Sequence, residues 1–165
     1  MAKLALSRDL SQAFGRQRMN QEQKRKLLTL LEQEHLAALI TQGERWPTGT
    51  LQAFAQTEEL TIIFIMGMSS ERFRNLMHRP HATMLIDTRD KAEPGSFAIA
   101  RAAIQGIAHE VAPGSAEWEG YKTVFLSKNP FEEPFFASDN LRMIRIEPKR
   151  VSYANGLADT FWVEL

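Results

Sequence analysis

"TIIFIMGMSSERFRNLMHRPHATMLID", residues 61–87, is the stretch that decides the fold. Its first residues belong to an apolar run, 60–66, which is too short for a buried helix and predicts a core strand. Two serines then begin a helix, which must end near Arg79 because Pro80 disfavours helical geometry at the residue before it. The apolar segment 81–88 predicts another strand. The stretch therefore predicts a strand, a short helix and a second strand.

The composition indicates one globular domain without a disulfide or thiolate framework. The chain has 165 residues, and its 20 basic and 20 acidic side chains give a formal net charge of zero, which argues against nucleic acid or an acidic membrane as partner. The absence of cysteine excludes disulfides, thiolate metal sites and cysteine nucleophiles. No apolar run reaches the roughly 18 residues of a membrane span, and no signal-peptide core is present. We therefore expect a soluble, cytoplasmic protein.

The first 26 residues differ in charge from the rest of the chain. They contain seven basic and only two acidic residues. Such a bias is typical of an organellar transit peptide, but also of an arm that holds a partner. We interpret residues 1–20 as a basic amino-terminal arm and residues 21–165 as a single folded domain.

The other segments predict strands with a few helices between them. Asn20 and Gln23 form a capping box before a one-sided apolar stripe, which predicts a helix over 21–34, and Ser115 caps a second helix. Residues 96–111 predict one long strand with Gly106 at a bulge or close approach, although their alanines would also suit a helix, and the breaker "APGS" that follows favours the strand. The predicted strands are 35–42, 48–57, 96–111, 141–148, 149–156 and 158–165, and loops are predicted at 89–95 and 129–140. This order fits an antiparallel barrel with peripheral helices better than a doubly wound sheet.

The start of the helix near residue 70 is the strongest candidate for a binding site. The common nucleotide, zinc-protease and hydrolase motifs are absent, and the four histidines have no recognisable ligand spacing. Ser69, Ser70 and Arg72 lie where unpaired N–H groups and the helix dipole favour an anion. One serine is equally explained as an N-cap. An anion site and a plain helix start both remain open.

The helical periodicity assigns a direction to each side chain of this helix. At about 100° per residue, Arg72 lies at one edge of the apolar face, Arg74 lies on the opposite flank, and Asn75 points away. We expect only Arg72 to lie over a cleft. The apolar face, which we expect to pack on the barrel, comprises Phe73, Leu76 and Met77.

Residues 22–165 resemble the pyridoxamine-phosphate-oxidase-like family of flavin-binding split barrels. The core pattern is a strand, then Ser-x-[Lys/Arg], Asn-Leu, Pro and an apolar strand, as in 61–87. The other matching segments are "LAALIT", "LQAFAQ", "ARAAIQGIAHEV" and "GLADTFW". The resemblance implies a mainly β fold, a six-stranded antiparallel split β-barrel of Greek-key type. It also implies a homodimer with flavin mononucleotide (FMN) bound between the subunits.

The resemblance assigns cofactor contacts to residues on several strands. Ser70 and Arg72 would contact the flavin phosphate, with Ser69 alongside. Ile65 and Met66 would lie against the ring or the ribityl chain. The remaining expected contacts are Thr50, Leu51 and Gln52 at the ring edge, Arg101 on the long strand, and Trp162 approaching from the partner subunit.

Three positions depart from the oxidases that act on pyridoxamine phosphate. Those proteins have basic residues where this chain has Thr50, Ala55 and Glu71. Each charge-assisted hydrogen bond to a phosphate is worth roughly 1.5–3 kcal/mol, so a weaker or differently compensated phosphate site is expected. The activity of those oxidases is not assigned to this chain.

Four hypotheses on function follow from the resemblance. The leading one is an FMN-dependent oxidoreductase acting on an unidentified small molecule, in which the cofactor carries the chemistry and no catalytic residue is named. A non-catalytic flavin carrier or sensor is the second, and a deazaflavin could replace FMN in either. The others are a haem-binding or haem-utilisation relative and a structural dimer that has lost its cofactor.

Overall fold

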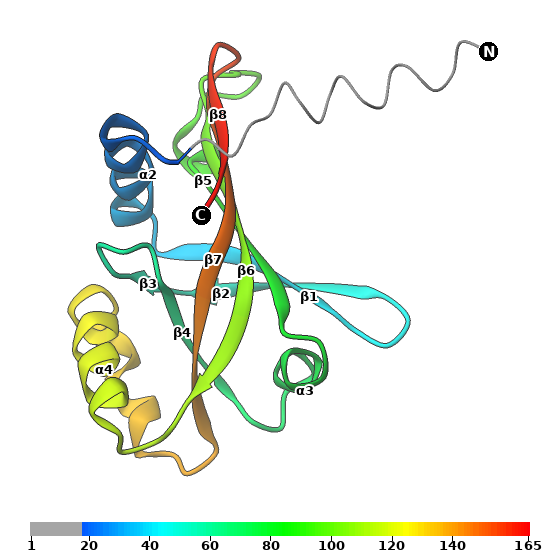
Figure 1. The fold of residues 1–165 in the computed structure, drawn as a ribbon, viewed down its shortest axis with the longest axis vertical. Coiled ribbons are helices and arrows are strands. Elements are labelled where there is room, and N and C mark those ends of the chain that lie inside the picture. The colour runs from blue at the N-terminus through cyan, green and yellow to red at the C-terminus, as the bar shows by residue number, and fades with distance from the viewer. Residues whose placement is uncertain (1–17) are drawn as a thin grey trace.

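The computed structural model describes residues 18–165, which form a curled antiparallel sheet with helices around it (Figure 1). Residues 1–17 of the predicted arm lie outside the described residues. The strands are β1 (Leu36–Gln42), β2 (Pro47–Ala53), β3 (Ala55–Gln56), β4 (Ile62–Gly67), β5 (His81–Asp87), β6 (Ala100–Val111), β7 (Leu141–Asn155) and β8 (Asp159–Glu164). The helices are α2 (Gln21–Gln33), α3 (Glu71–His78) and α4 (Ala116–Lys128), with 3-10 helices η1 (Arg89–Lys91) and η2 (Pro130–Ala137). The predicted mainly β fold is confirmed.

The sheet closes into a barrel because one segment of chain belongs to both of its ends. The strand order is β2-β1-β5-β6-β7-β4-β3, and only Phe54 separates β2 from β3. With β2 and β3 counted as one bent strand, six strands form the barrel, and β8 is added along β7. Across the split, the Gln52 side chain donates from Nε2 to the Ile65 carbonyl at 3.0 Å. The predicted split barrel is confirmed.

Three predicted strand boundaries are wrong. The strand predicted over 96–111 begins only at Ala100, as β6. Residues 48–57 are not one regular strand, since the ladder is interrupted at Phe54. Residues 141–148 and 149–156 form one strand, β7, although Pro148 lies inside it. The chain continues past Pro148 because Gln105 pairs with Arg150 while Gly106 pairs with Pro148. This register shift forms a bulge, at which a missing proline N–H is tolerated.

Gly106 lies at the closest approach of β6 and β7. A Cβ atom at this position would lie 2.2 Å from the carbonyl oxygen of Glu147 and 2.6 Å from a methyl group of Ile146. Only glycine allows the two backbones to come this close. The predicted bulge or close approach at Gly106 is confirmed.

The predicted helix starts are confirmed by their caps. The Asn20 side chain accepts from the Gln23 N–H while the Gln23 side chain accepts from the Asn20 N–H, both at 2.9 Å. Ser70 accepts from the Phe73 N–H at 3.3 Å, and Ser115 accepts from the Trp118 N–H at 3.1 Å. Each hydroxyl or amide satisfies an N–H group that has no partner within its helix.

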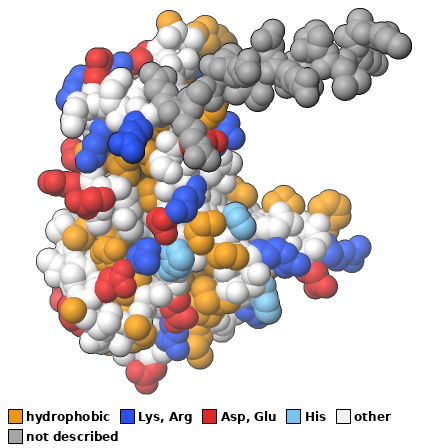
Figure 2. Space-filling view, viewed as in Figure 1, with side chains coloured by type: hydrophobic (Ala, Val, Ile, Leu, Met, Phe, Trp, Pro, Cys, Tyr) orange, Lys and Arg blue, Asp and Glu red, His pale blue; other side chains and the backbone are white. Residues whose placement is uncertain are grey.

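Two apolar clusters lie on the two sides of the sheet. The larger fills the barrel and includes Leu39, Phe64 and Ile104, each fully buried. The smaller lies between β4 and α4 and includes Ile63 and Phe125. On the visible surface, acidic and basic side chains are interspersed (Figure 2), in keeping with the zero net charge. Within residues 18–165, no helix is long and apolar enough to cross a membrane.

Candidate functional site

The candidate site lies where β4 ends and α3 begins. β4 is fully buried as far as Met66, and the chain then turns through Gly67 and Met68 into the α3 cap. The Ser70 hydroxyl is used as the N-cap, so the plain explanation suffices for this serine. The Ser69 hydroxyl lies 3.5 Å from the Asn140 side-chain nitrogen and remains exposed. Ser69 is therefore the serine available to a ligand.

The faces of α3 differ from the expected ones at two positions. Met77, expected to pack on the barrel, is 41% exposed, and Asn75, expected to point away, is buried. Asn75 is buried because β1 supplies a hydrogen-bond partner for it: Asn75 donates from Nδ2 to the Thr41 hydroxyl at 3.1 Å. Arg72 is half-buried, and its Nε has no hydrogen-bond partner among the described residues.

Three of the five buried side-chain N and O atoms that have no hydrogen-bond partner among the described residues lie on β2 and α3. They are Thr50 Oγ1, Gln52 Oε1 and Arg72 Nε. Thr50 pairs with Leu39 and Gln52 pairs with Ala37, both buried, so the two side chains lie on the inner face of β2. Buried polar atoms without partners are rare in folded proteins. All three belong to residues predicted to contact a cofactor, and they offer two acceptors and one donor.

Glu71 does not share the face of Arg72. It lines a polar hollow between α3 and the β1–β2 hairpin, together with Glu44, Arg74, Asn75 and His78, and Arg72 is not among the lining residues. Glu71, whose charge was expected to weaken anion binding at the start of α3, therefore lies on the same flank of the helix as Arg74. This placement agrees with the expected position of Arg74 and reduces the conflict between Glu71 and a phosphate.

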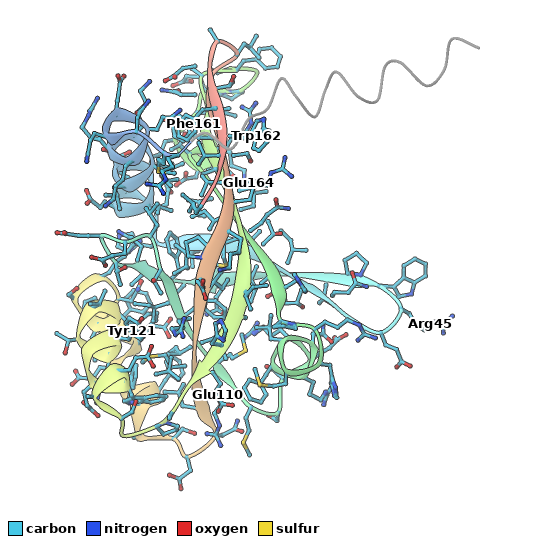
Figure 3. All side chains as sticks on the ribbon, in the orientation of Figure 1. Arg45, Glu110, Tyr121, Phe161, Trp162 and Glu164 are labelled. Atoms are coloured by element: carbon cyan, nitrogen blue, oxygen red, sulfur yellow. The ribbon has the colours of Figure 1, made fainter. Side chains whose placement is uncertain are left out.

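The other predicted residues lie on the outer face of the sheet. Leu51 is 68% exposed there, Arg101 is exposed, and Trp162 is half-buried beneath Arg150, whose guanidinium lies 4.8 Å from the indole centroid. Trp162 lies on β8, in the upper part of the molecule and well above Glu110 on β6 (Figure 3). One copy of the chain therefore does not bring Trp162 to the β4–α3 junction.

Register pairing connects Leu51 and Trp162 through one row of residues. Successive partners across the strands are Leu51, Ala38, Leu85, Ala103, Ser152 and Trp162. Directly paired residues lie side by side on the same face of a sheet. The row crosses β2, β1, β5, β6, β7 and β8, so the two residues lie at its opposite ends.

The contacts of Arg142, which stabilise the turn beside the β4–α3 junction, were not predicted from the sequence. Arg142 pairs with Met66 across the β4–β7 ladder. Its Nε lies 3.2 Å from the Glu110 carboxylate, Nη1 donates to the Asp139 and Leu141 carbonyls, and Nη2 lies 2.9 Å from the Met68 sulfur. Most donors of this guanidinium are thus in use, so Arg142 stabilises the turn and does not replace the missing basic residues. The long sequence separation between Arg142 and Met66 left no local signal.

Comparison with known proteins places this arrangement in a structural class. Neither a family model nor a curated protein matches the chain. A haem-binding protein from Mycobacterium smegmatis matches with a TM-score of 0.76 and 18% identity, over 86% of this chain and 57% of that one. A putative pyridoxamine 5'-phosphate oxidase from Listeria innocua matches with a TM-score of 0.63 and 20% identity, over 81% and 98%. The fold is the pyridoxamine-phosphate-oxidase-like split barrel.

The split barrel is shared by proteins that are described in different terms. The haem storage protein HutZ from Vibrio cholerae has the same fold, with a TM-score of 0.65 and 16% identity over 83% of this chain and 94% of that one. At these identities the likeness establishes the fold alone. This split-barrel chain spans about 57% of the Mycobacterium smegmatis protein.

The split barrel has a further hollow on its outer face. Its volume is about 340 Å³, and its apolar floor is formed by Leu36, Ala38, Leu51 and Leu85. Four of the five acidic and basic residues that line it occur in ion pairs: Lys91 with Glu34, and Arg89 Nε with Asp87 at 2.9 Å. His35 also lines this hollow.

Proposed function

We propose that the chain binds a flavin, FMN, between β2 and the start of α3. The observation that carries the proposal is the set of three unpartnered buried atoms, Thr50 Oγ1, Gln52 Oε1 and Arg72 Nε. A flavin ring has an imide N–H that needs an acceptor such as Gln52 Oε1, and its phosphate needs donors such as Arg72 and Ser69. Met66, at the end of β4, is buried in the cluster that fills the barrel, whereas the Ile65 side chain is buried on the other side of the sheet and contributes only its backbone.

The proposed phosphate site has one cation and several neutral donors. Arg72 is the charged group, while Ser69 and the first N–H groups of α3 add dipoles. Glu71 lines the hollow on the Arg74 side of α3, so its negative charge does not lie on the side of the helix that would hold the phosphate. We therefore expect flavin binding that depends strongly on Arg72.

We further propose that the active form is a homodimer built on the outer face. A two-fold axis parallel to the strands, placed over the middle of the row from Leu51 to Trp162, reverses that row in the second copy. Trp162 of the partner subunit then lies over Leu51, on the face of β2 opposite to Thr50 and Gln52. This arrangement would bring Trp162 to β2, the strand that carries Thr50 and Gln52, and it would bury Leu36 and Leu51, which are 53% and 68% exposed.

The activity we propose is that of an oxidoreductase on a small molecule. A bound flavin would supply hydride or electron transfer, while the chain provides orientation and a dry site. Gln52 would orient the ring, Arg72 would anchor its phosphate, and Met66 would exclude water from its buried edge. A cytoplasmic location suits the lack of cysteine.

The test is flavin binding by paired arginine variants. Purified protein is titrated with FMN, and binding is followed by absorbance and by quenching of flavin fluorescence. Arg72→Ala should weaken FMN binding about tenfold or more, since a charge-assisted bond to phosphate is lost. Arg74→Ala, on the other flank of α3, should change it little. A wild-type protein that binds no FMN, or equal losses in both variants, would contradict the proposal.

Reduction then separates an enzyme from a carrier. Bleaching of the bound flavin by a reduced nicotinamide nucleotide favours the oxidoreductase, whereas a flavin that binds but is never reduced favours a carrier or sensor. A deazaflavin has the same imide edge and is recognised by its different absorbance spectrum.

Haem is the second candidate, and the outer hollow is the observation that favours it. His35 offers a nitrogen ligand beside the apolar floor of Leu36, Leu51 and Leu85. Lys91 and Arg89 would have to exchange their partners Glu34 and Asp87 for the haem carboxylates. Two proteins with this fold are described as haem-binding or haem storage proteins. Titration with haemin should give a Soret band that Arg72→Ala leaves intact and His35→Ala removes if this candidate is correct.

A further inference from the structure

The strand that carries Thr50 and Gln52 is interrupted at a fully buried residue, Phe54. There the chain leaves its pairing with β1 and joins β4. The Phe54 N–H donates to the His35 carbonyl at 3.3 Å. The Phe54 carbonyl accepts from the Asn129 side chain at 3.0 Å, so a side-chain amide occupies the place of a neighbouring strand. A buried backbone group needs such a substitute, and this one is supplied by the end of α4.

The Lys128 side chain makes further contacts around the strand interruption at Phe54. Its ammonium group donates to the Leu31 carbonyl at 2.6 Å and to the Gln56 side chain at 2.8 Å. It also lies 3.7 Å from the centroid of the Phe54 ring. Leu31 lies in the last turn of α2, where carbonyl groups have no partner within the helix. One lysine thus joins α2, β3 and the residue at the break.

We propose that Lys128 and Asn129 are positioning residues for the flavin site. They set the backbone angle at Phe54 and thereby hold Gln52 against Ile65, and this role rests on the function proposed above. Only Ala53 separates Gln52 from Phe54, so a change of angle at the break passes directly to the Gln52 side chain. The Gln52–Ile65 bond and the Asn129–Phe54 bond close the split on either side of Ala53.

The geometry distinguishes this role from general packing. Asn129 is fully buried and makes a second bond, to the Phe125 carbonyl at 3.3 Å, which ties its amide to the last turn of α4. The amide therefore has a fixed direction when it meets Phe54. Loss of the Lys128 and Asn129 contacts should loosen residues 50–56 and leave distant strands unchanged.

The test is hydrogen–deuterium exchange at pH 7, with FMN affinity as a second measurement. Lys128→Met keeps an unbranched apolar side chain but removes the ammonium donors. It should lower the protection of amides in residues 50–56 about tenfold or more, leave β5 unchanged, and weaken FMN binding about fivefold. Lys122→Met is the matched control, because Lys122 is on the same helix and lies 5.1 Å from the Phe136 ring centroid. It should change neither measurement.

A milder variant keeps the result interpretable if Lys128→Met folds poorly. Gln56→Leu removes one acceptor of Lys128 and should loosen the same segment to a smaller extent. Unchanged protection of residues 50–56, or an equal loss across the whole sheet, would overturn the positioning role. A wild-type protein that fails to bind FMN would refute the proposed function, while the exchange data would still decide whether Lys128 holds the break.

Discussion

Replacing Gly106 by alanine should destabilise the protein far more than one methyl group would suggest. The new Cβ would lie 2.2 Å from the Glu147 carbonyl oxygen, whereas an ordinary contact begins near 3.4 Å. The two backbones must therefore separate by about 1.2 Å, the difference between these distances. The obstacle is backbone and not the end of a flexible side chain, so it cannot rotate away.

The expected magnitude combines two losses. Overpacking in a tight site costs about 1–3 kcal/mol, and the separation would also break one or two ladder hydrogen bonds worth about 1 kcal/mol each. We expect a loss of about 3 kcal/mol in the free energy of unfolding. For a chain of this length that corresponds to a fall in Tm of about 6–12 °C.

The control is the same substitution at Gly120, in α4. A Cβ there would meet nothing within 4 Å. Alanine in an exposed helical position should raise the free energy of unfolding by about 0.5–1 kcal/mol. Urea unfolding followed by circular dichroism measures both variants. If Gly106→Ala lost less than about 1 kcal/mol, the close approach of β6 and β7 would not be as tight as described.

Two further predictions concern the dimer and pH. Leu51→Glu should convert the proposed dimer to a monomer in sedimentation velocity, because it places a charge in the interface proposed on the outer face. Leu157→Glu, in the exposed β7–β8 turn, should leave the dimer intact. A dimer that survives Leu51→Glu would show that the interface lies elsewhere. Burial lowers the pKa of Lys128 from 10.5 to about 8, so between these values the folded state binds fewer protons than the unfolded state. This lysine's contribution to the free energy of unfolding should therefore rise with pH from 8 upward, and Lys128→Met should flatten that rise in melts between pH 7.5 and 9.5.

Local chemistry was enough to predict most elements of the fold. The capping box of Asn20, the caps at Ser70 and Ser115, and the stop before Pro80 all depend on neighbours within four residues. Gly106 was also predicted, because a lone glycine inside an apolar strand indicates a close approach. The continuity of β7 could not be predicted, because Pro148 is tolerated only through a register shift against a distant strand.

The candidate site was predicted only in part. The order of Ser69, Ser70 and Arg72 is local, and the structure sets them at the start of α3. The direction of Asn75 was wrong because the polar group that buries it, Thr41, is supplied by another element. The ion pair between Arg142 and Glu110 depends on strand pairing across the barrel, and helical periodicity gives no information on which strands pair.

The pairing of β4 determines when the barrel can form during synthesis. β4 is a run of buried apolar residues, and its long partner is the first half of β7, which begins at Leu141. At about 5–20 residues per second, the ribosome needs on the order of ten seconds to make the chain between them. For that interval the "IIFIM" segment of the nascent chain has only the two-residue β3 to pair with, and such a segment is prone to β-aggregation. Productive folding of this protein therefore depends on protection of β4 until the first residues of β7, which begins the last 25 residues of this sequence, have emerged.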